Sequence, residues 1–162
     1  FAGKFLAYKG LLEEKQVSWL PSYGPEMRGS KCNCSVCISD EPIGSPQVLE
    51  PDLLVVLNGP SFDAFMPCVK PGGKAFVDCS MVDAKTDRTD IDTFYIPATQ
   101  LSEDNHLSKG ANIVLLGKLL HETGIFSFET VRKALEKNTP ASRAHTIDNN
   151  MAALQLGADY AG

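Results

Sequence analysis

Three cysteines within a few positions are the side chains of this sequence best suited to metal chemistry. Cys32, Cys34 and Cys37 form a C-x-C-x-x-C run, and closely spaced thiolates are typical ligands of zinc and of iron-sulfur clusters. On a β-strand, however, Cys32 and Cys34 share one face and Cys37 points to the other. Cys68 and Cys79 follow at no ligand-like spacing. We therefore predict small apolar strand residues here and no metal site in this chain.

The loop SYGPEMRGS at residues 22–30 precedes these cysteines and is dense in hydrogen-bonding groups. Two interpretations remain open. In the first, its glycines and proline set the backbone angles of a crossover turn, and Glu26 pairs with Arg28 in solvent. In the second, the loop presents a binding site, because α/β sheets place sites on loops that follow strands. The polar side chains in question are Ser22, Tyr23, Glu26 and Arg28, and the turn residues are Gly24, Pro25 and Gly29.

Other catalytic patterns are weak. His106, His121 and His145 fall on predicted helices or at their ends, with no Ser or Cys motif tied to them, so we predict surface or capping histidines and no catalytic residue. PGGK at 71–74 is too short for a phosphate-binding loop, and a strand rather than a helix follows it. Neither a G-x-G-x-x-G motif nor a thiamine-type motif occurs in the sequence.

Composition limits the class of protein. The 162 residues are 43% hydrophobic and 22% charged, with a net charge of -5, which predicts one globular domain over residues 1–162. No apolar run approaches the roughly 18 residues of a membrane span. The net negative charge argues against nucleic-acid binding. An odd number of cysteines, five, favours free thiols in a reducing cytoplasm.

Periodicity predicts alternating elements. Strands are expected at 17–21, 32–39, 52–58, 74–79 and 92–98, where short apolar or β-branched runs end in turn residues. Helices are expected at 2–15, from Ser61, and at 111–124, 127–138 and 140–162. Ser127 is the predicted N-cap of the helix at 127–138, and Thr139 that of the last helix.

This order predicts an α/β fold with a mixed, largely parallel sheet layered with helices, and a helical C-terminal part. The mixed character is expected because two strands flank a hairpin-like turn at 40–46. The run DLLVVLN at 52–58 indicates a strand covered on both faces. A β-α unit that begins with a helix lacks its first strand, which would normally be central, so we expect that strand to be missing from the chain.

The stretch WLPSYGPEMRGSKCNCSVCISDEPIGSP at 19–46 closely resembles the gamma subunit, or gamma domain, of the 2-oxoacid:ferredoxin oxidoreductases. The resemblance continues through EPDLLVVLNGPSFDAF, VKPGG, YIPAT, KGANIVLLGKLL and TGIFSFETVRKAL, and so spans most of the chain. Family members begin with a strand and a GGQG-like turn, which this chain lacks. They more often have RGG where this chain has Arg28-Gly29-Ser30, which makes the backbone less free there.

The resemblance implies a subunit that is not catalytic alone. The family decarboxylates a 2-oxoacid, transfers two electrons to ferredoxin and forms an acyl-coenzyme A. Thiamine diphosphate, iron-sulfur clusters and Mg are expected in partner subunits (alpha, beta and in some assemblies delta), with coenzyme A as co-substrate and no cofactor bound by this chain alone. Among the oxoacids, 2-oxoglutarate is favoured over pyruvate and branched-chain oxoacids.

Under this resemblance the loop at 22–30 is expected at a subunit interface or a coenzyme A cleft. Arg28 would offer a charged fork to a carboxylate or phosphate, and Tyr23 and Met27 would pack against the same partner. Asn112, at a helix start, is a second polar candidate at the partner face, and the alternative is an ordinary residue of a helix N-terminus. The remaining interface residues expected are Ser22, Gly24, Pro25, Glu26 and Gly29. The competing hypothesis is a stand-alone nucleotide-binding or scaffold domain without catalytic activity.

Overall fold

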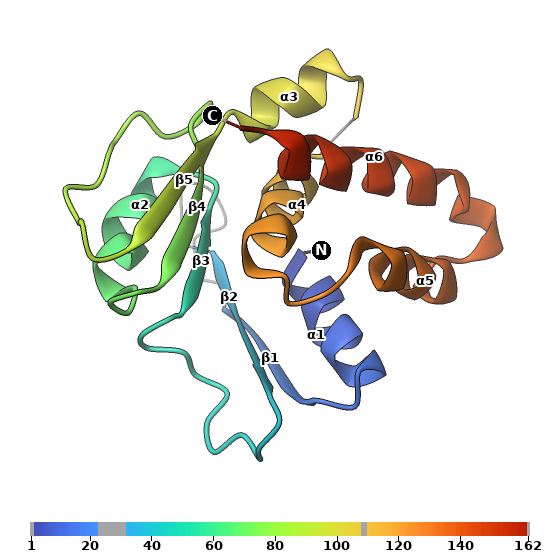
Figure 1. Cartoon of the computed structure of the whole chain (residues 1–162), viewed down its shortest axis with the longest axis horizontal. Coiled ribbons are helices and arrows are strands. Elements are labelled where there is room, and N and C mark those ends of the chain that lie inside the picture. The colour runs from blue at the N-terminus through green and yellow to red at the C-terminus, as the bar shows by residue number, and fades with distance from the viewer. Residues whose placement is uncertain (1, 23–31, 108–109, 162) are drawn as a thin grey trace. The chain divides into compact units, whose positions relative to one another are not determined.

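The computed structural model describes residues 2–22, 32–107 and 110–161. The chain consists of two compact units, Phe1–Pro51 and Asp52–Gly162 (Figure 1). No helix within the described ranges has the length and apolar character of a membrane span.

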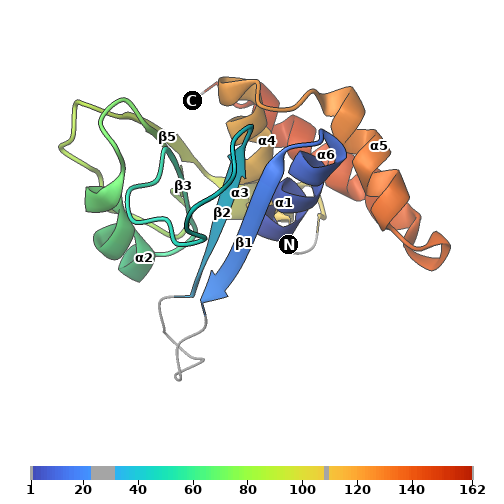
Figure 2. The same ribbon diagram turned by 90° about the horizontal axis from the view of Figure 1, so that it is seen from below.

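The first unit is one helix on a two-stranded hairpin (Figure 2). The hairpin pairs β1 (Gln16–Ser22) with β2 (Asn33–Ser39) in antiparallel register, with Trp19 opposite Val36. Helix α1 (Ala2–Leu12) lies along it, and close packing is possible because Gly3 and Gly10 face the hairpin without side chains. The helix is shorter than the predicted 2–15, since Glu14 adopts a left-handed φ of 58° and turns the chain into β1.

The second unit is built on a parallel sheet in the order β3-β4-β5. Its strands are β3 (Leu53–Val56), β4 (Lys74–Asp78) and β5 (Asp92–Ile96). One face carries α2 (Gly59–Phe65) and the short helix η1 (Met66–Cys68) over an apolar core that includes Phe62 and Val77. Asn58 begins α2 by accepting a hydrogen bond from the Ser61 backbone N–H at 2.9 Å.

The C-terminal part is helical, as expected. Two of its helices, α4 (Ala111–Thr123) and α6 (His145–Asp159), cross closely at Gly117 and Gly157, where an added Cβ would meet the backbone of the opposite helix. Helix α4 also packs on β4, and its residues 113–120 are all buried. Ser127 caps α5 (Phe128–Asn138) by accepting from the Thr130 N–H at 3.3 Å, as predicted. The elements are α3 (Ala98–Asp104), α4 (Ala111–Thr123), α5 (Phe128–Asn138), η2 (Ala141–Arg143) and α6 (His145–Asp159).

A buried lysine joins α4 to the end of α6. Lys118 is only 6% exposed, and its Nζ donates to the Tyr160 carbonyl at 2.8 Å and pairs with Glu122 at 2.8 Å. The ammonium also lies 5.4 Å from the ring centroid of Phe94, which stacks on Phe76. These partners compensate the charge for the loss of water around it.

The connection between β4 and β5 is held by an arginine. Arg88 pairs with Asp90 through two hydrogen bonds of 2.9 and 2.6 Å, and its Nη1 donates to the Met66 and Val69 carbonyls at 3.1 and 2.7 Å. The Tyr95 hydroxyl accepts from the backbone N–H of Thr86 at 2.9 Å. The long β4–β5 connection is therefore fixed to η1 and β5.

The α/β class with a largely parallel sheet and a helical C-terminal part is confirmed, but two predictions were wrong and one helix was missed. The turn at 40–46 does not join paired strands, because β2 pairs with β1 and β3 pairs with β4. Thr139 does not cap the last helix. It ends α5 by donating its N–H to the Leu135 carbonyl, and α6 begins only at His145. Helix α3 was not predicted as a separate element. The prediction of one domain over 1–162 stays a prediction.

Candidate functional site

The structure describes one residue of the predicted loop site. Ser22 is exposed at the end of β1, opposite Asn33 of β2. The other residues of that prediction lie outside the described residues, and their roles stay predictions. They are Tyr23, Gly24, Pro25, Glu26, Met27, Arg28 and Gly29.

Asn112, the second polar candidate from the sequence, lies within the described residues and has an unusual environment. It follows Ala111 at the start of α4, where the N-cap Gly110 offers no side-chain cap. Its Oδ1 is buried and has no hydrogen-bond partner among the described residues. Ser102 of α3 holds the start of α4, because its Oγ accepts from the Gly110 N–H at 3.0 Å. A buried acceptor without a partner is rare enough to need an explanation, and an external donor would supply one.

The carboxyl end of the central strand holds an acid that the sequence analysis missed. Asp78 is fully buried at the end of β4, where open α/β sheets often place ligands. Its Oδ2 accepts from Thr99 Oγ1 at 2.6 Å, and its Oδ1 accepts from the backbone N–H groups of Ser80 and Thr99 at 3.1 and 3.3 Å. Both oxygens thus hold the start of α3. The signal in the sequence was an acid directly after the apolar run KAFV.

Two large apolar side chains stand beside this carboxyl edge. Leu57 follows β3 and is 40% exposed, and Met81 follows β4 and is 57% exposed. Asn58 is occupied in capping α2. The edge therefore offers apolar contact surface rather than a free acid or base, which is suited to protein contact more than to catalysis.

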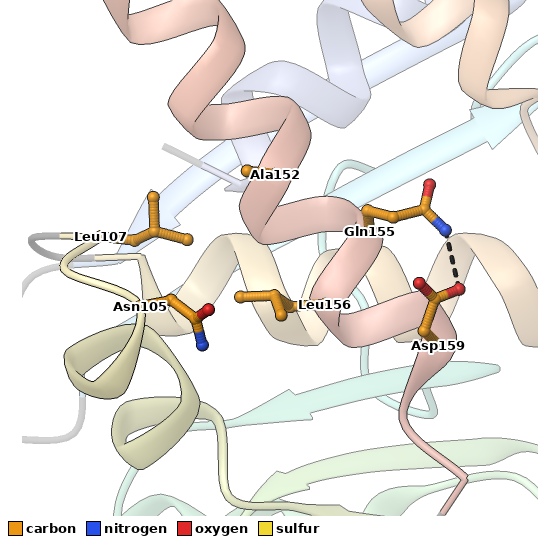
Figure 3. Close-up of a pocket in the computed structure, with 6 residues that line it drawn as sticks. All are labelled: Asn105, Leu107, Ala152, Gln155, Leu156 and Asp159. Carbon is orange, nitrogen blue, oxygen red and sulfur yellow. Dashed lines mark hydrogen bonds between the residues drawn. The ribbon is translucent and has the colours of Figure 1, made fainter.

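A pocket of about 310 Å³ opens between the end of α3 and one face of α6 (Figure 3). Ala152 and Leu156 lie between two polar sides, and Gln155 Nε2 donates to Asp159 Oδ1 at 2.7 Å on one of them. On the other side, Asn105 Nδ2 donates to the Leu101 carbonyl at 2.9 Å. The sequence analysis did not predict this site, although the Gln-x-x-x-Asp spacing marks a hydrogen-bonded helical pair. Its lining residues are Asn105, Leu107, Ala152, Gln155, Leu156 and Asp159.

The cysteines and histidines form no centre in the described ranges. Cys32 and Cys34 are exposed and Cys37 is half-buried. No group of three or more His, Cys, Asp or Glu side chains there is placed to hold a metal ion. The three histidines, His106, His121 and His145, are exposed, as predicted for surface residues.

The resolved pKa shifts belong to surface pairs. Hydrogen bonding to Arg88 lowers the pKa of Asp90, and hydrogen bonding to Lys133 lowers the pKa of Glu129. Arg88 and Asp90 fix the β4–β5 connection, and Glu129 and Lys133 are one turn apart on α5. These shifts therefore mark stabilising ion pairs rather than acid-base groups of a site.

Comparison with known sequences gives one family and several subunits. The profile described as "Pyruvate ferredoxin/flavodoxin oxidoreductase" matches residues 1–160. The 2-oxoglutarate synthase subunit KorC of Methanocaldococcus jannaschii is 37% identical over 93% of this chain and 80% of that protein. The ketoisovalerate oxidoreductase subunit VorA of Methanothermobacter marburgensis is 35% identical over 98% of this chain and 33% of that protein. The chain thus spans about a third of the length of VorA.

Solved structures share the fold. The gamma subunit of a keto/oxoacid ferredoxin oxidoreductase from Geobacter sulfurreducens superposes with a TM-score of 0.77 at 28% identity, over 98% of this chain and 88% of that one. A 2-oxoglutarate:ferredoxin oxidoreductase from Magnetococcus marinus, with 2-oxoglutarate, coenzyme A and succinyl-CoA bound, gives a TM-score of 0.82 at 21% identity, over 96% of this chain and 27% of that one. The second likeness is one of fold alone.

Proposed function

Because this chain belongs to the pyruvate ferredoxin/flavodoxin oxidoreductase family, we propose that it is the gamma subunit of a 2-oxoacid:ferredoxin oxidoreductase. The observation that carries the proposal is the 37% identity to a 2-oxoglutarate synthase subunit of which this chain covers 80%. The solved relative with a TM-score of 0.77 is also a gamma subunit. In this proposal, the present chain acts in the cytoplasm.

The complete enzyme converts a 2-oxoacid and coenzyme A to acyl-coenzyme A and carbon dioxide and passes two electrons to ferredoxin. Thiamine diphosphate with Mg supplies the electron sink for decarboxylation, and iron-sulfur clusters carry the electrons. Both belong to partner subunits of the alpha, beta or delta type. This chain contributes contact surface and orientation, and it has no turnover by itself. Asp78 supports this division of labour, since its oxygens are already engaged in holding α3.

The favoured substrate is 2-oxoglutarate. The support is that the 2-oxoglutarate synthase subunit KorC matches this chain over most of its own length. The ketoisovalerate subunit matches with similar identity over a third of its length. Pyruvate and ketoisovalerate are therefore the competing substrates, and the choice between them is made by the thiamine-binding chains.

Two contacts of this chain are part of the proposal. In the loop at 22–30, Arg28 binds an anion, either a phosphate of coenzyme A or a carboxylate of a partner, and Tyr23 and Met27 pack beside it. At the start of α4, Asn112 Oδ1 accepts a hydrogen bond. An amide oxygen does not suit a phosphate, so its ligand is an N–H or O–H donor, such as an amide of coenzyme A or a partner backbone.

The central experiment is purification of the tagged protein from its own cells, followed by identification of the co-purifying chains. The complex is then assayed for dye reduction with 2-oxoglutarate, pyruvate or ketoisovalerate, each with and without coenzyme A. We expect turnover that requires coenzyme A and is fastest with 2-oxoglutarate. An inactive monomer that binds a nucleotide would instead establish the stand-alone domain, and faster turnover with another oxoacid would overturn the substrate assignment alone.

Asn112→Ala distinguishes a binding residue from a structural one. Removing an acceptor that lacks a partner should leave the free energy of unfolding of the isolated chain unchanged or raise it. In the complex, the same variant should raise the KM for coenzyme A or weaken assembly about fivefold or more. Ser102→Ala is the matched control, since Ser102 bonds within the chain and its loss should lower stability first. If Asn112→Ala changed neither coenzyme A affinity nor assembly, its binding role would be excluded.

A further inference from the structure

The pocket between α3 and α6 leaves a set of polar atoms that share one property. Gln155 donates an amide N–H to Asp159 Oδ1, and Asn105 donates one to the Leu101 carbonyl. What remains is Gln155 Oε1, Asn105 Oδ1 and Asp159 Oδ2, and all three are acceptors. In the described ranges no donor of the chain bonds to any of them. The three side chains are exposed, and their free acceptors favour a ligand that donates hydrogen bonds.

The electrostatic environment further limits which ligands can bind in the pocket. Asp159 carries a full negative charge, and it is the last residue of α6. Asn105 is the C-cap of α3, so the partial negative charge of that helix end lies at the pocket. At the end of α6, the Tyr160 carbonyl already accepts from Lys118. The chain as a whole has a net charge of -5. A cation is favoured by these negative charges, and an anion is disfavoured.

The apolar residues of the lining limit the choice of ligand again. Ala152 and Leu156 lie between the polar sides (Figure 3), and Leu107 completes the lining. A small hydrated metal ion gains nothing from these side chains. A lysine or arginine side chain matches both parts, because its aliphatic stem packs on leucine while its charged end donates hydrogen bonds. The volume of about 310 Å³ is enough for such a side chain.

We propose that the α3–α6 pocket receives a lysine or arginine side chain of a partner subunit. The inference rests on the proposed function, because it needs a partner chain in the assembled oxidoreductase. It goes beyond that function by naming the surface of this chain that the partner contacts and the chemistry that the partner presents. The contact acts in assembly and leaves the chemical step untouched.

The chain offers a matched control for the test. Gln100 Nε2 donates to Asp104 Oδ1 at 2.8 Å, and this pair has the same four-residue spacing at the end of α3 as Gln155 and Asp159 have at the end of α6. Asp104 does not line the pocket. Asp159→Asn and Asp104→Asn therefore each remove one charge from a Gln–Asp pair at a helix end, and of the two acids only Asp159 lines the pocket.

The experiment compares these variants in the reconstituted complex. The dissociation constant between this subunit and its partners is measured as a function of salt concentration. Asp159→Asn should weaken assembly about tenfold at low salt and flatten the salt dependence, and Asp159→Lys should weaken it further. Asp104→Asn should change the dissociation constant less than twofold. Equal effects of Asp159→Asn and Asp104→Asn would overturn the inference.

A photo-crosslinking amino acid at position 152, which is exposed, identifies the occupant. We expect an adduct with a partner subunit on a peptide that contains a lysine or arginine, and exchange of that base for glutamate should restore the assembly of Asp159→Lys. An adduct with a second copy of this chain, or none in an assembled complex, would overturn the inference and leave the proposed function intact. If no complex forms at all, the proposed function fails with it.

Discussion

The two units of the chain pack a helix closely against different partners, a hairpin in the first and a second helix in the second. In Phe1–Pro51, α1 lies on a two-stranded hairpin, and its Gly10 faces side chains: an added Cβ would lie 2.8 Å from Val17 Cγ2. In Asp52–Gly162, α4 and α6 cross so closely that a Cβ on Gly117 or Gly157 would strike backbone atoms. Side chains can change rotamer, whereas the backbone of a packed helix cannot move alone. The crossing of α4 and α6 should therefore tolerate far less at Gly117 and Gly157 than α1 does at Gly10.

The largest effect is expected at the crossing of α4 and α6. Gly157→Ala should lower the free energy of unfolding by about 3 kcal/mol or more, because the methyl group forces the helices apart. Urea unfolding of the full chain measures this loss. Gly59→Ala is the control, since nothing lies within 4 Å of its added Cβ. Similar stabilities for the two variants would show that the crossing yields easily.

The second largest loss of stability is expected at Asp78, the buried acid of the second unit. Asp78→Ala leaves the N–H groups of Ser80 and Thr99 and the Thr99 hydroxyl without their acceptor. We expect a loss of about 2–3 kcal/mol in urea unfolding. Asp78→Asn should cost less, because its carbonyl oxygen can still accept from both backbone groups. An equal loss for both variants would mean that the charge, rather than the hydrogen bonds, holds α3.

A smaller effect, and one that depends on pH, is expected at Arg88. The pKa of Asp90 is lowered by its hydrogen bonds with Arg88. The pair therefore stabilises the fold above the unfolded pKa of about 4, and this stabilisation is lost as the pH falls through the lower folded value. Arg88→Ala should lower the urea midpoint at pH 7 and flatten the decline in stability below about pH 4. Asp90→Asn should flatten it in the same way, and a steeper decline in either variant would contradict this reading.

The smallest effect is expected at α1. Gly10→Ala gains up to about 1 kcal/mol of helix propensity but crowds Val17 and Ile38. The two contributions are comparable, so the net change in unfolding free energy should stay within about 1 kcal/mol. Combining Gly10→Ala with Val17→Ala tests the cause, since the crowding should then be relieved. A loss as large as that of Gly157→Ala would erase the contrast between the units.

Local features of the sequence predicted much of the fold. The strands, the helix at 111–124 and the Ser127 cap follow from apolar periodicity and capping chemistry within a few residues. Strand pairing did not, because the partners of β2 and β3 are decided by contacts distant in the chain. Pro140 after Thr139 has the form of a helix start, yet Thr139 is the C-cap of α5.

The candidate sites divide in the same way. The loop at 22–30 and Asn112 were identified from residue types and from a family resemblance. Asp78 and the α3–α6 pocket were missed, because the pocket is formed by segments about fifty residues apart, 105–107 and 152–159. Single-residue motifs do not reveal which helix ends meet. The free acceptors of Asn105, Gln155 and Asp159 become visible only once their donors have been assigned.

Trp19 lies on β1 and is the sole tryptophan of the sequence. The residue is 42% exposed, so its fluorescence emission should shift to longer wavelength when the hairpin opens. The helical signal in circular dichroism comes mainly from α2 to α6 of the other unit. Each unit thus carries its own optical reporter. Overlaying the two denaturation curves of one sample would reveal whether the hairpin melts with the helices or before them, without a label or a truncation.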